Sequence, residues 1–534
     1  MSTDKAQAAS PSASGATPKR AGLVLTSLIL GALLCNVNLT VANVALPAIG
    51  TALDATQTQI TLIAVGCTLG LAMSVLYLGA IGDRYGRKLL LLSGAALTVP
   101  IAIFCTFAPS AELLIIGRIL TGVAAGMAYP TTLALITALW GNGPARTKAI
   151  ALWSASSAGV TVLAPIIAGW LLERYWWGSV FLIVVPVAVA AFIFVFMFVP
   201  SHVNESKDRV DNLGGLLSIV MVAALVLGIS TISAPGLQGP AVGLLILAVV
   251  FVILFAIRQR KASNPLYDLH YAARRLFWVP AVAGMIVFGS LMGSMFIGQQ
   301  FMQNVLGYST FNAGLAIVPA AIGMLAVAPR SAKLVGSHGS RFTLLAGYVF
   351  ILPALLIMLL VWREGTSYVF VGLAYLLIGI GAGLALTPAS HSLTGSVPVS
   401  RVGMASGTAD LQRDLGGSIM QAIMGTALTF GYAASLAAGI SDSADASDVS
   451  SRTEAALLQS FTGAEQVADS YPQYKEQILS AATESFLSGS NWAYAAAVAA
   501  VALGALLVAT RFPGKTGEAA LSEQYRQQDA NVGA

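Results

Sequence analysis

Residues 79–88 of this chain read GAIGDRYGRK, and they join two apolar stretches at about 59–81 and 88–108. Each stretch is long enough to cross ~30 Å of hydrocarbon as a helix. A short charged turn between two such stretches is expected at a membrane surface, where its charges stay in water and its glycines let two helix ends approach. This sequence therefore predicts a tight loop between two membrane-spanning helices.

The composition supports a membrane protein. Of the 534 residues, 57% are hydrophobic and only 10% are charged, against roughly 25% charged in a soluble domain. Apolar segments of spanning length recur at about fourteen places. We expect spanning helices at about 22–48, 59–81, 88–108, 113–139, 148–172, 177–199, 212–233, 240–257, 277–300, 311–335, 341–361, 367–390, 403–433 and 491–511.

The cysteines and the charges exclude several other classes of protein. Cys35, Cys67 and Cys105 lie inside apolar segments without metal-ligand spacing, so we expect no disulfide framework, metal or other cofactor. The net charge of +5 does not point to a nucleic-acid partner, because 22 of the 28 Lys and Arg residues fall on the cytoplasmic side when loops are counted from an N-terminus inside. This positive-inside bias predicts that both termini are cytoplasmic.

A degraded internal repeat suggests two related halves. In residues 332–341, Gly339 falls on Gly86 of the first loop, whereas Gly336 falls on Asp83. Paired halves are what a transporter that rocks around a midplane site requires. We therefore predict a disordered cytoplasmic tail at 1–20, a six-helix bundle at 21–200, a linker with two extra helices at 201–275, a second six-helix bundle at 276–511 with an extracellular loop at about 435–490, and a cytoplasmic tail at 512–534.

The first loop resembles the signature GxLaDrxGrkxxL, which lies between the second and third helices of the major facilitator superfamily. Fourteen helices narrow the resemblance to its drug:proton antiporters, and residues 177–182 and 414–416 look most like the branch that exports quaternary ammonium compounds. The resemblance implies an all-α fold of two six-helix bundles plus two inserted helices, with the loop as a gating element. The loop residues that match are Gly79, Asp83, Arg84, Gly86, Arg87 and Lys88.

The chain departs from the family pattern in two helices. The family has an aspartate, a candidate for proton coupling, where this chain has Asn38, and an asparagine side chain does not titrate. The antiporter motif of the fifth helix, GxxxGPxxGG, is weakened, although Gly159, Pro165 and Gly169 remain. Small residues still allow close helix packing there.

Four charged residues lie well inside predicted spans, namely Arg118, Asp410, Arg413 and Asp414. A charge at the bilayer centre costs about 2.5–3.5 kcal/mol, so these residues are expected to be partnered or to face water. An Asp410 to Arg413 contact is geometrically possible. Asp414 is then the candidate proton carrier, with Asp410 as a second candidate. For Arg118, the resemblance implies a role in coupling to proton exchange. The alternative is that all four only lock helices together.

Two helix faces are candidates for contact with a substrate. Asn36, Thr40 and Asn43 share one face of the first helix, and Asn38 projects about 200° away. These side chains serve equally well as interhelical hydrogen-bonding groups. Flexible side chains recur at three- and four-residue steps along the ninth helix and form a stripe on one face. Such a stripe can contact flat cations, and the alternative is that it only packs against neighbouring helices. The stripe residues are Met285, Phe288, Met292, Phe296, Gln299 and Gln303.

The function that fits best is a proton-driven exporter of lipophilic, cationic compounds from a bacterial cell membrane. Its partners are then a small-molecule substrate, protons and the lipid bilayer, and we expect a monomer. Secondary transport is favoured because no GxxxxGK[ST] sequence is present to bind ATP. Alternatives are an exporter of a lipid or secreted metabolite, a facilitator without proton coupling, and a membrane-embedded enzyme or pore. An enzyme is disfavoured because HExxH, GxSxG and clustered His and Cys are absent.

Overall fold

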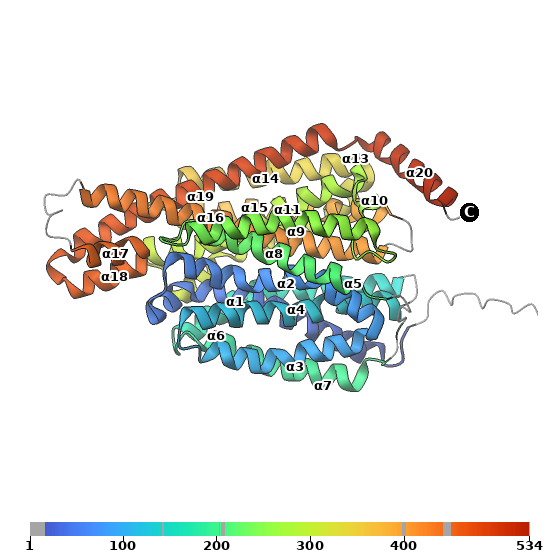
Figure 1. Ribbon diagram of the computed structural model, residues 1–534, viewed down its shortest axis with the longest axis horizontal. Helices are drawn as coiled ribbons and strands as arrows, with labels where there is room; N and C mark the ends of the chain where they lie inside the picture. Colours follow the sequence, from blue (N-terminus) through green and yellow to red (C-terminus); the bar gives the residue numbers. More distant parts are fainter. Residues whose placement is uncertain are drawn as a thin grey trace, which may run out of the picture.

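Long helices lie side by side along the longest axis of the protein (Figure 1). The computed structural model describes residues 17–140, 144–201, 203, 209–397, 402–441 and 450–532. Within these residues, thirteen helices are long and apolar enough to cross a membrane. A further helix of 29 residues, α5 (Pro144–Leu172), lies at the remaining predicted span. The predicted all-α membrane fold is therefore confirmed.

The helices fall into three groups along the chain. Before residue 200 they are α1 (Ala21–Leu53), α2 (Gln57–Tyr85), α3 (Arg87–Thr106), α4 (Ala111–Leu139), α5, α6 (Ser179–Leu182) and α7 (Val184–Phe198). The inserted helices are α8 (Asn212–Thr231) and α9 (Gln238–Lys261), with the short α10 (Leu269–Ala272) after them. The later helices are α11 (Arg275–Gln300) with a π-helical turn at Phe301–Val305, α12 (Thr310–Ala316), α13 (Val318–His338), α14 (Ser340–Leu360), α15 (Tyr368–Gly395), α16 (Val402–Ser441), α17 (Ser451–Gln459), α18 (Phe461–Ser470), α19 (Lys475–Arg511) and α20 (Lys515–Val532).

The two ends of the bundle are distinguished by the helices that lie there. Helices α17 and α18 lie at the left end in Figure 1, here called the α18 end, and α20 lies at the right end, here called the α20 end. The helices of the first group occupy the lower part of this view, and most of the last group the upper part, with α8 and α9 in front. Helix α8 contacts both α2 and α16, so the inserted pair lies against both groups.

The two loops of the internal repeat adopt the same backbone turn. Gly86 separates α2 from α3 with φ 113°, and Gly339 separates α13 from α14 with φ 87°. Positive φ at both positions favours glycine, which has no Cβ to clash with the backbone. The correspondence of Gly339 with Gly86 in the sequence therefore marks a real structural repeat.

The segment expected as one loop at about 435–490 contains more helix than the sequence suggested. Helix α16 continues to Ser441 and α19 already begins at Lys475. Between them lie the short helices α17 and α18. The division between these two helices falls at Ser460, because its side chain accepts a hydrogen bond from the Gly463 amide and caps α18. The tail expected at 512–534 likewise contains α20.

Candidate functional site

Arg118 lies on α4, in the first group of helices, and is only 1% exposed. It reaches this position because α2 presents glycines to α4. A Cβ on Gly66 would lie 2.9 Å from the Arg118 Cβ, and a Cβ on Gly70 would lie 2.1 Å from the Ile119 carbonyl oxygen. Gly122 of α4 faces Gly70 in the same crossing. Small residues thus bring the two backbones close enough for Arg118 to reach across.

The guanidinium of Arg118 binds backbone carbonyl groups. Its Nη1 donates to the Asn38 carbonyl oxygen at 2.9 Å and its Nε to the Ile63 carbonyl oxygen at 3.3 Å. Among the described residues, Nη2 has no hydrogen-bond partner. The amide of Asn38 is engaged elsewhere, since its Nδ2 donates to Leu34 in the same helix. The structure therefore brings Asn38 and Arg118 together, at the position where the family pattern has an acid.

The acids of α16 lie where the two groups of helices meet. Asp414 is 3% exposed, and in the described part of the chain its Oδ2 has no hydrogen-bond partner. Its helix, α16, packs against both α2 of the first group and α11 of the last group. Asp410, one turn earlier, is half-buried. Asp414 is therefore a carboxyl group withdrawn from water, between helices that belong to different groups.

Arg413 has a different partner from the one expected. Its Nη1 donates to the hydroxyl group of Tyr129 on α4 at 3.3 Å, and its guanidinium lies 5.5 Å from the Tyr129 ring and 5.2 Å from the Phe288 ring. No ion pair between Asp410 and Arg413 is formed in the described residues. The Asp410 contact that the spacing allows is not formed, because the Arg413 guanidinium lies against the aromatic rings of Tyr129 on α4 and Phe288 on α11. Tyr129 carries no sequence signal that predicts this contact.

Charged residues of the loop at 79–88 form hydrogen bonds with the neighbouring helices α4 and α7. Asp83 forms an ion pair with Arg87 at 2.9 Å, and Arg87 also donates to the Ala134 carbonyl oxygen of α4 at 3.4 Å. Lys88 donates to the Phe196 carbonyl oxygen of α7 at 2.9 Å. A Cβ on Gly79 would meet no atom within 4 Å. The charges of this loop are thus held at the α20 end, and the Asp83 side chain stays half-exposed.

The polar residues expected on α1 mostly bond within that helix. Asn36 donates to the Ala32 carbonyl oxygen at 2.8 Å, and Thr40 donates to that of Asn36 at 2.9 Å. Asn43 is buried. Their side chains are therefore positioned by α1 itself, and the structure does not bring them together with Asp414 by any hydrogen bond between described residues.

The residues of the stripe on α11 and its π-helical turn contact three different helices, α16, α12 and α1. Met292 packs near Gly417 of α16, and Phe296 is completely buried in the core. At the α18 end, Gln299 donates to the Ala313 carbonyl oxygen at 2.9 Å and Gln303 donates to that of Val44 on α1 at 3.0 Å. The amide end of the stripe thus links α11 to α12 and to the first group of helices.

The two groups of helices are in direct contact at the α18 end. Thr310 of α12 donates to the Gly169 carbonyl oxygen of α5 at 3.0 Å, and a Cβ on Gly314 would lie 2.6 Å from the Pro165 carbonyl oxygen. Gln57 of α2 donates to Gln300 of α11 at 3.1 Å. A Cβ on Gly159, by contrast, would meet no atom within 4 Å. The motif residues Pro165 and Gly169 therefore lie at the interface, and the amide pair is a contact that the sequence did not indicate.

Comparison with known proteins identifies the family. The family model of the Major Facilitator Superfamily matches residues 28–421. The chain is 30% identical over 416 residues to the multidrug efflux pump LfrA of Mycolicibacterium smegmatis, a match that covers 78% of this chain and 82% of LfrA. It is also 30% identical over 422 residues to the multidrug resistance protein Stp of Mycobacterium tuberculosis, covering 78% and 77% of the two chains.

A solved structure shares the fold. A bacterial homologue of the human lysosomal transporter Spinster, in an inward-facing and unoccupied conformation, superposes with a TM-score of 0.62 at 16% identity, over 92% of this chain and 97% of the homologue. At 16% identity, this similarity supports a shared fold and nothing further. The family match agrees with the thirteen helices, counted in the described residues, that are long and apolar enough to cross a membrane: the chain belongs to the major facilitator superfamily and is a multi-pass membrane transporter, not an enzyme.

Proposed function

We propose that this transporter is a proton-coupled exporter of lipophilic, cationic drugs, acting as a monomer in a bacterial cell membrane with both termini in the cytoplasm. The observation that carries the proposal is Asp414, a buried carboxyl group whose Oδ2 has no hydrogen-bond partner in the described part of the chain. The names of LfrA and Stp as multidrug proteins support drug export. Residues 21–200 and 276–511 then form the two halves that rock against each other during transport.

Proton coupling requires a group that changes its protonation when the site changes sides. A carboxyl group withdrawn from water holds a proton more readily than one in water. Asp414 has this environment, and Arg413 on the same helix is occupied by Tyr129 of the opposite half. When rocking separates α4 from α16, Arg413 loses this partner. Its positive charge, no longer held by Tyr129, then favours the ionised form of the nearby carboxyl groups of α16, which lose the proton to water on the side that has opened.

Binding of a lipophilic cation suits the same region. The rings of Tyr129 and Phe288 already flank one cationic group, the guanidinium of Arg413. Aromatic faces attract cations, and flexible methionines such as Met292 adapt to differently shaped ligands. A drug cation that enters beside Asp414 would favour its deprotonated form, which couples substrate binding to loss of the proton.

The second candidate is export of a lipid or secreted metabolite, or facilitated movement without protons. The presence of Asn38 in place of the family acid favours this alternative. An efflux assay in everted membrane vesicles with an imposed pH gradient separates these functions. We expect uptake of ethidium that stops when an ionophore dissipates the gradient, and no uptake of a neutral dye of similar size. Gradient-independent ethidium movement would identify a facilitator, and no ethidium movement at all would contradict drug export.

A further inference from the structure

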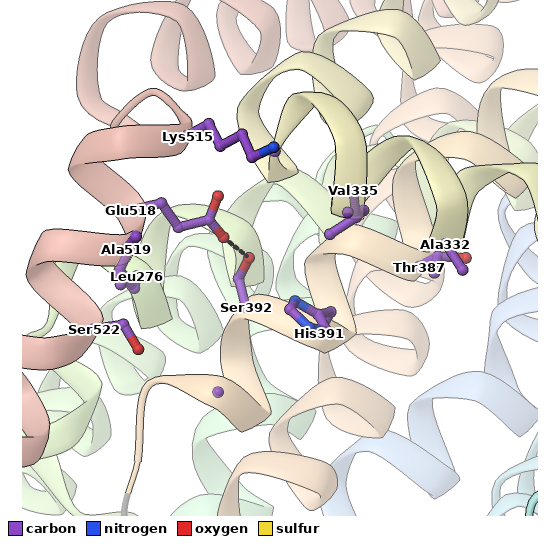
Figure 2. Close-up of a pocket in the computed structure, with 13 residues that line it drawn as sticks. Leu276, Ala332, Val335, Thr387, His391, Ser392, Lys515, Glu518, Ala519 and Ser522 are labelled. Carbon is purple, nitrogen blue, oxygen red and sulfur yellow. Dashed lines mark hydrogen bonds between the residues drawn. The ribbon is translucent and has the colours of Figure 1, made fainter.

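Helix α20 lies across the ends of several helices of the second half, at the α20 end of the protein (Figure 1). It begins at Lys515, directly after the turn that ends α19. Figure 2 shows its residues Lys515 and Glu518 pointing toward the ends of α13 and α15. Gly339 permits this approach, because a Cβ there would lie 2.9 Å from the Lys515 Cβ.

Glu518 caps the N-terminus of α14. Its Oε2 accepts a hydrogen bond from the Ser340 amide at 3.0 Å, and its Oε1 accepts one from the Ser340 hydroxyl group at 2.6 Å. The residue at the cap position is Gly339, which has no side chain to serve this purpose. A second bond to Oε1, donated by Ser392 at 3.3 Å, connects α15 to the same carboxylate. A residue 178 positions away in the sequence thus satisfies the Ser340 amide, the first N–H group of α14.

The charges of α20 match the dipoles of the helices it covers. The N-terminus of a helix favours an anion and its C-terminus favours a cation. Glu518 lies at the N-terminus of α14, and Lys515 donates to the Ser337 carbonyl oxygen in the last turn of α13 at 2.8 Å. The two side chains are three residues apart, so they lie on the same face of α20.

The far end of α20 is anchored in the same half of the protein. Asp529 forms an ion pair with Arg274 at 2.5 Å, and Arg274 also donates to the Ser396 carbonyl oxygen at 2.7 Å. Tyr525 contacts the same guanidinium, 4.6 Å from its ring centre. Helix α20 therefore connects the ends of α11, α13, α14 and α15.

This arrangement supplies what the second loop of the repeat lacks. In the first loop, Asp83 provides an acid beside the α2–α3 turn, where it pairs with Arg87. The corresponding residue of the second loop is Gly336, which carries no charge. We propose that Glu518 replaces this missing acid, so that α20 and the α13–α14 loop form one gating unit of the second half. Glu518 is then a positioning residue for the transport cycle, and the proposal depends on transport but not on its coupling to protons.

Three variants test this role: one that removes the Glu518 charge, one control on the same helix, and one that restores an acid in the loop. Glu518→Gln removes the charge with little change in shape. Glu523→Gln is the matched control, since Glu523 lies on the exposed part of α20 and, among the described residues, contacts only Arg526 and Gln527 of the same helix. Gly336→Asp, added to Glu518→Gln, places an acid at the position equivalent to Asp83, where a new Cβ would meet no atom within 4 Å.

Two measurements on full-length protein decide the outcome. By hydrogen exchange in lipid nanodiscs, we expect Glu518→Gln to raise amide exchange at residues 340–344 about tenfold, and Gly336→Asp to reverse the increase. By ethidium efflux, we expect a loss of turnover with an unchanged KM, again reversed by Gly336→Asp and absent in Glu523→Gln. Unchanged exchange in Glu518→Gln, altered exchange with wild-type turnover, or no rescue would each overturn the proposal. If the wild type exports no ethidium, the proposed substrate class fails while the exchange measurement still tests Glu518.

Discussion

The glycine crossing of α2 and α4 allows a quantitative prediction for Gly70→Ala. The added Cβ would lie 2.1 Å from the Ile119 carbonyl oxygen, whereas ordinary van der Waals contact begins at 3.4 Å, so the helices must separate by about 1.3 Å at this point. Overpacking of this kind costs about 1–3 kcal/mol. The same movement lengthens the hydrogen bond from the Arg118 Nε to the Ile63 carbonyl oxygen of α2, which measures 3.3 Å. Stability and transport are therefore expected to fall together.

Thermal unfolding with a thiol-reactive dye measures this effect directly, because Cys35, Cys67 and Cys105 are all buried and free. We expect a lower Tm for Gly70→Ala than for wild type, together with reduced ethidium efflux. Gly243→Ala on α9 is the matched control, since a Cβ there meets no atom within 4 Å, and its Tm should not fall. Equal Tm and equal efflux in the two variants would refute the account of how Arg118 is positioned.

Three further predictions concern the gate, the coupling and the orientation. Asp83→Asn removes the ion pair of the first loop. We expect turnover to fall by at least about fivefold while the substrate Kd changes by less than about twofold. Lost binding with intact exchange kinetics would contradict a gating role. Asn38→Asp introduces a carboxyl group at the residue whose backbone binds Arg118, and the Arg118 Nη2 has no hydrogen-bond partner in the described structure. We expect a higher proton-to-substrate ratio in proteoliposomes. An unchanged ratio would argue against position 38 as the site of the missing proton carrier. Single cysteines at Ser10 and Ser450, in a background without the native cysteines, should react with an impermeant thiol reagent in intact cells only at Ser450, and labelling at Ser10 would reverse the orientation.

Much of the fold follows from local sequence. Apolar runs of spanning length, separated by charged or glycine-containing turns, located the spanning helices because lipid requires each backbone segment to satisfy its own hydrogen bonds. The turn at Gly86 was also predictable, since glycine tolerates the positive φ that joins α2 to α3. The second copy at Gly339 was weaker in sequence, yet it has the same backbone form.

Tertiary contacts were harder to predict. The Arg413 contact with Tyr129 joins residues 284 positions apart, and spacing along α16 suggested Asp410 instead. Helix α20 has no apolar run of its own, and its place depends on Glu518 and Asp529, which bind partners 178 and 255 positions away. Such pairs become visible only when the packing of the helices is known.

Asp414, supported by Asp410, is the residue that we propose carries the proton. The most direct measurement is the number of protons released by purified protein when a lipophilic cation is added in weakly buffered solution with a pH indicator. We predict that wild-type protein releases protons, that Asp414→Asn releases none while still folded and inserted, and that it no longer accumulates substrate against a gradient. Proton release at the wild-type level in both Asp414→Asn and Asp410→Asn would contradict the account and leave the chain as a facilitator or a differently coupled exporter.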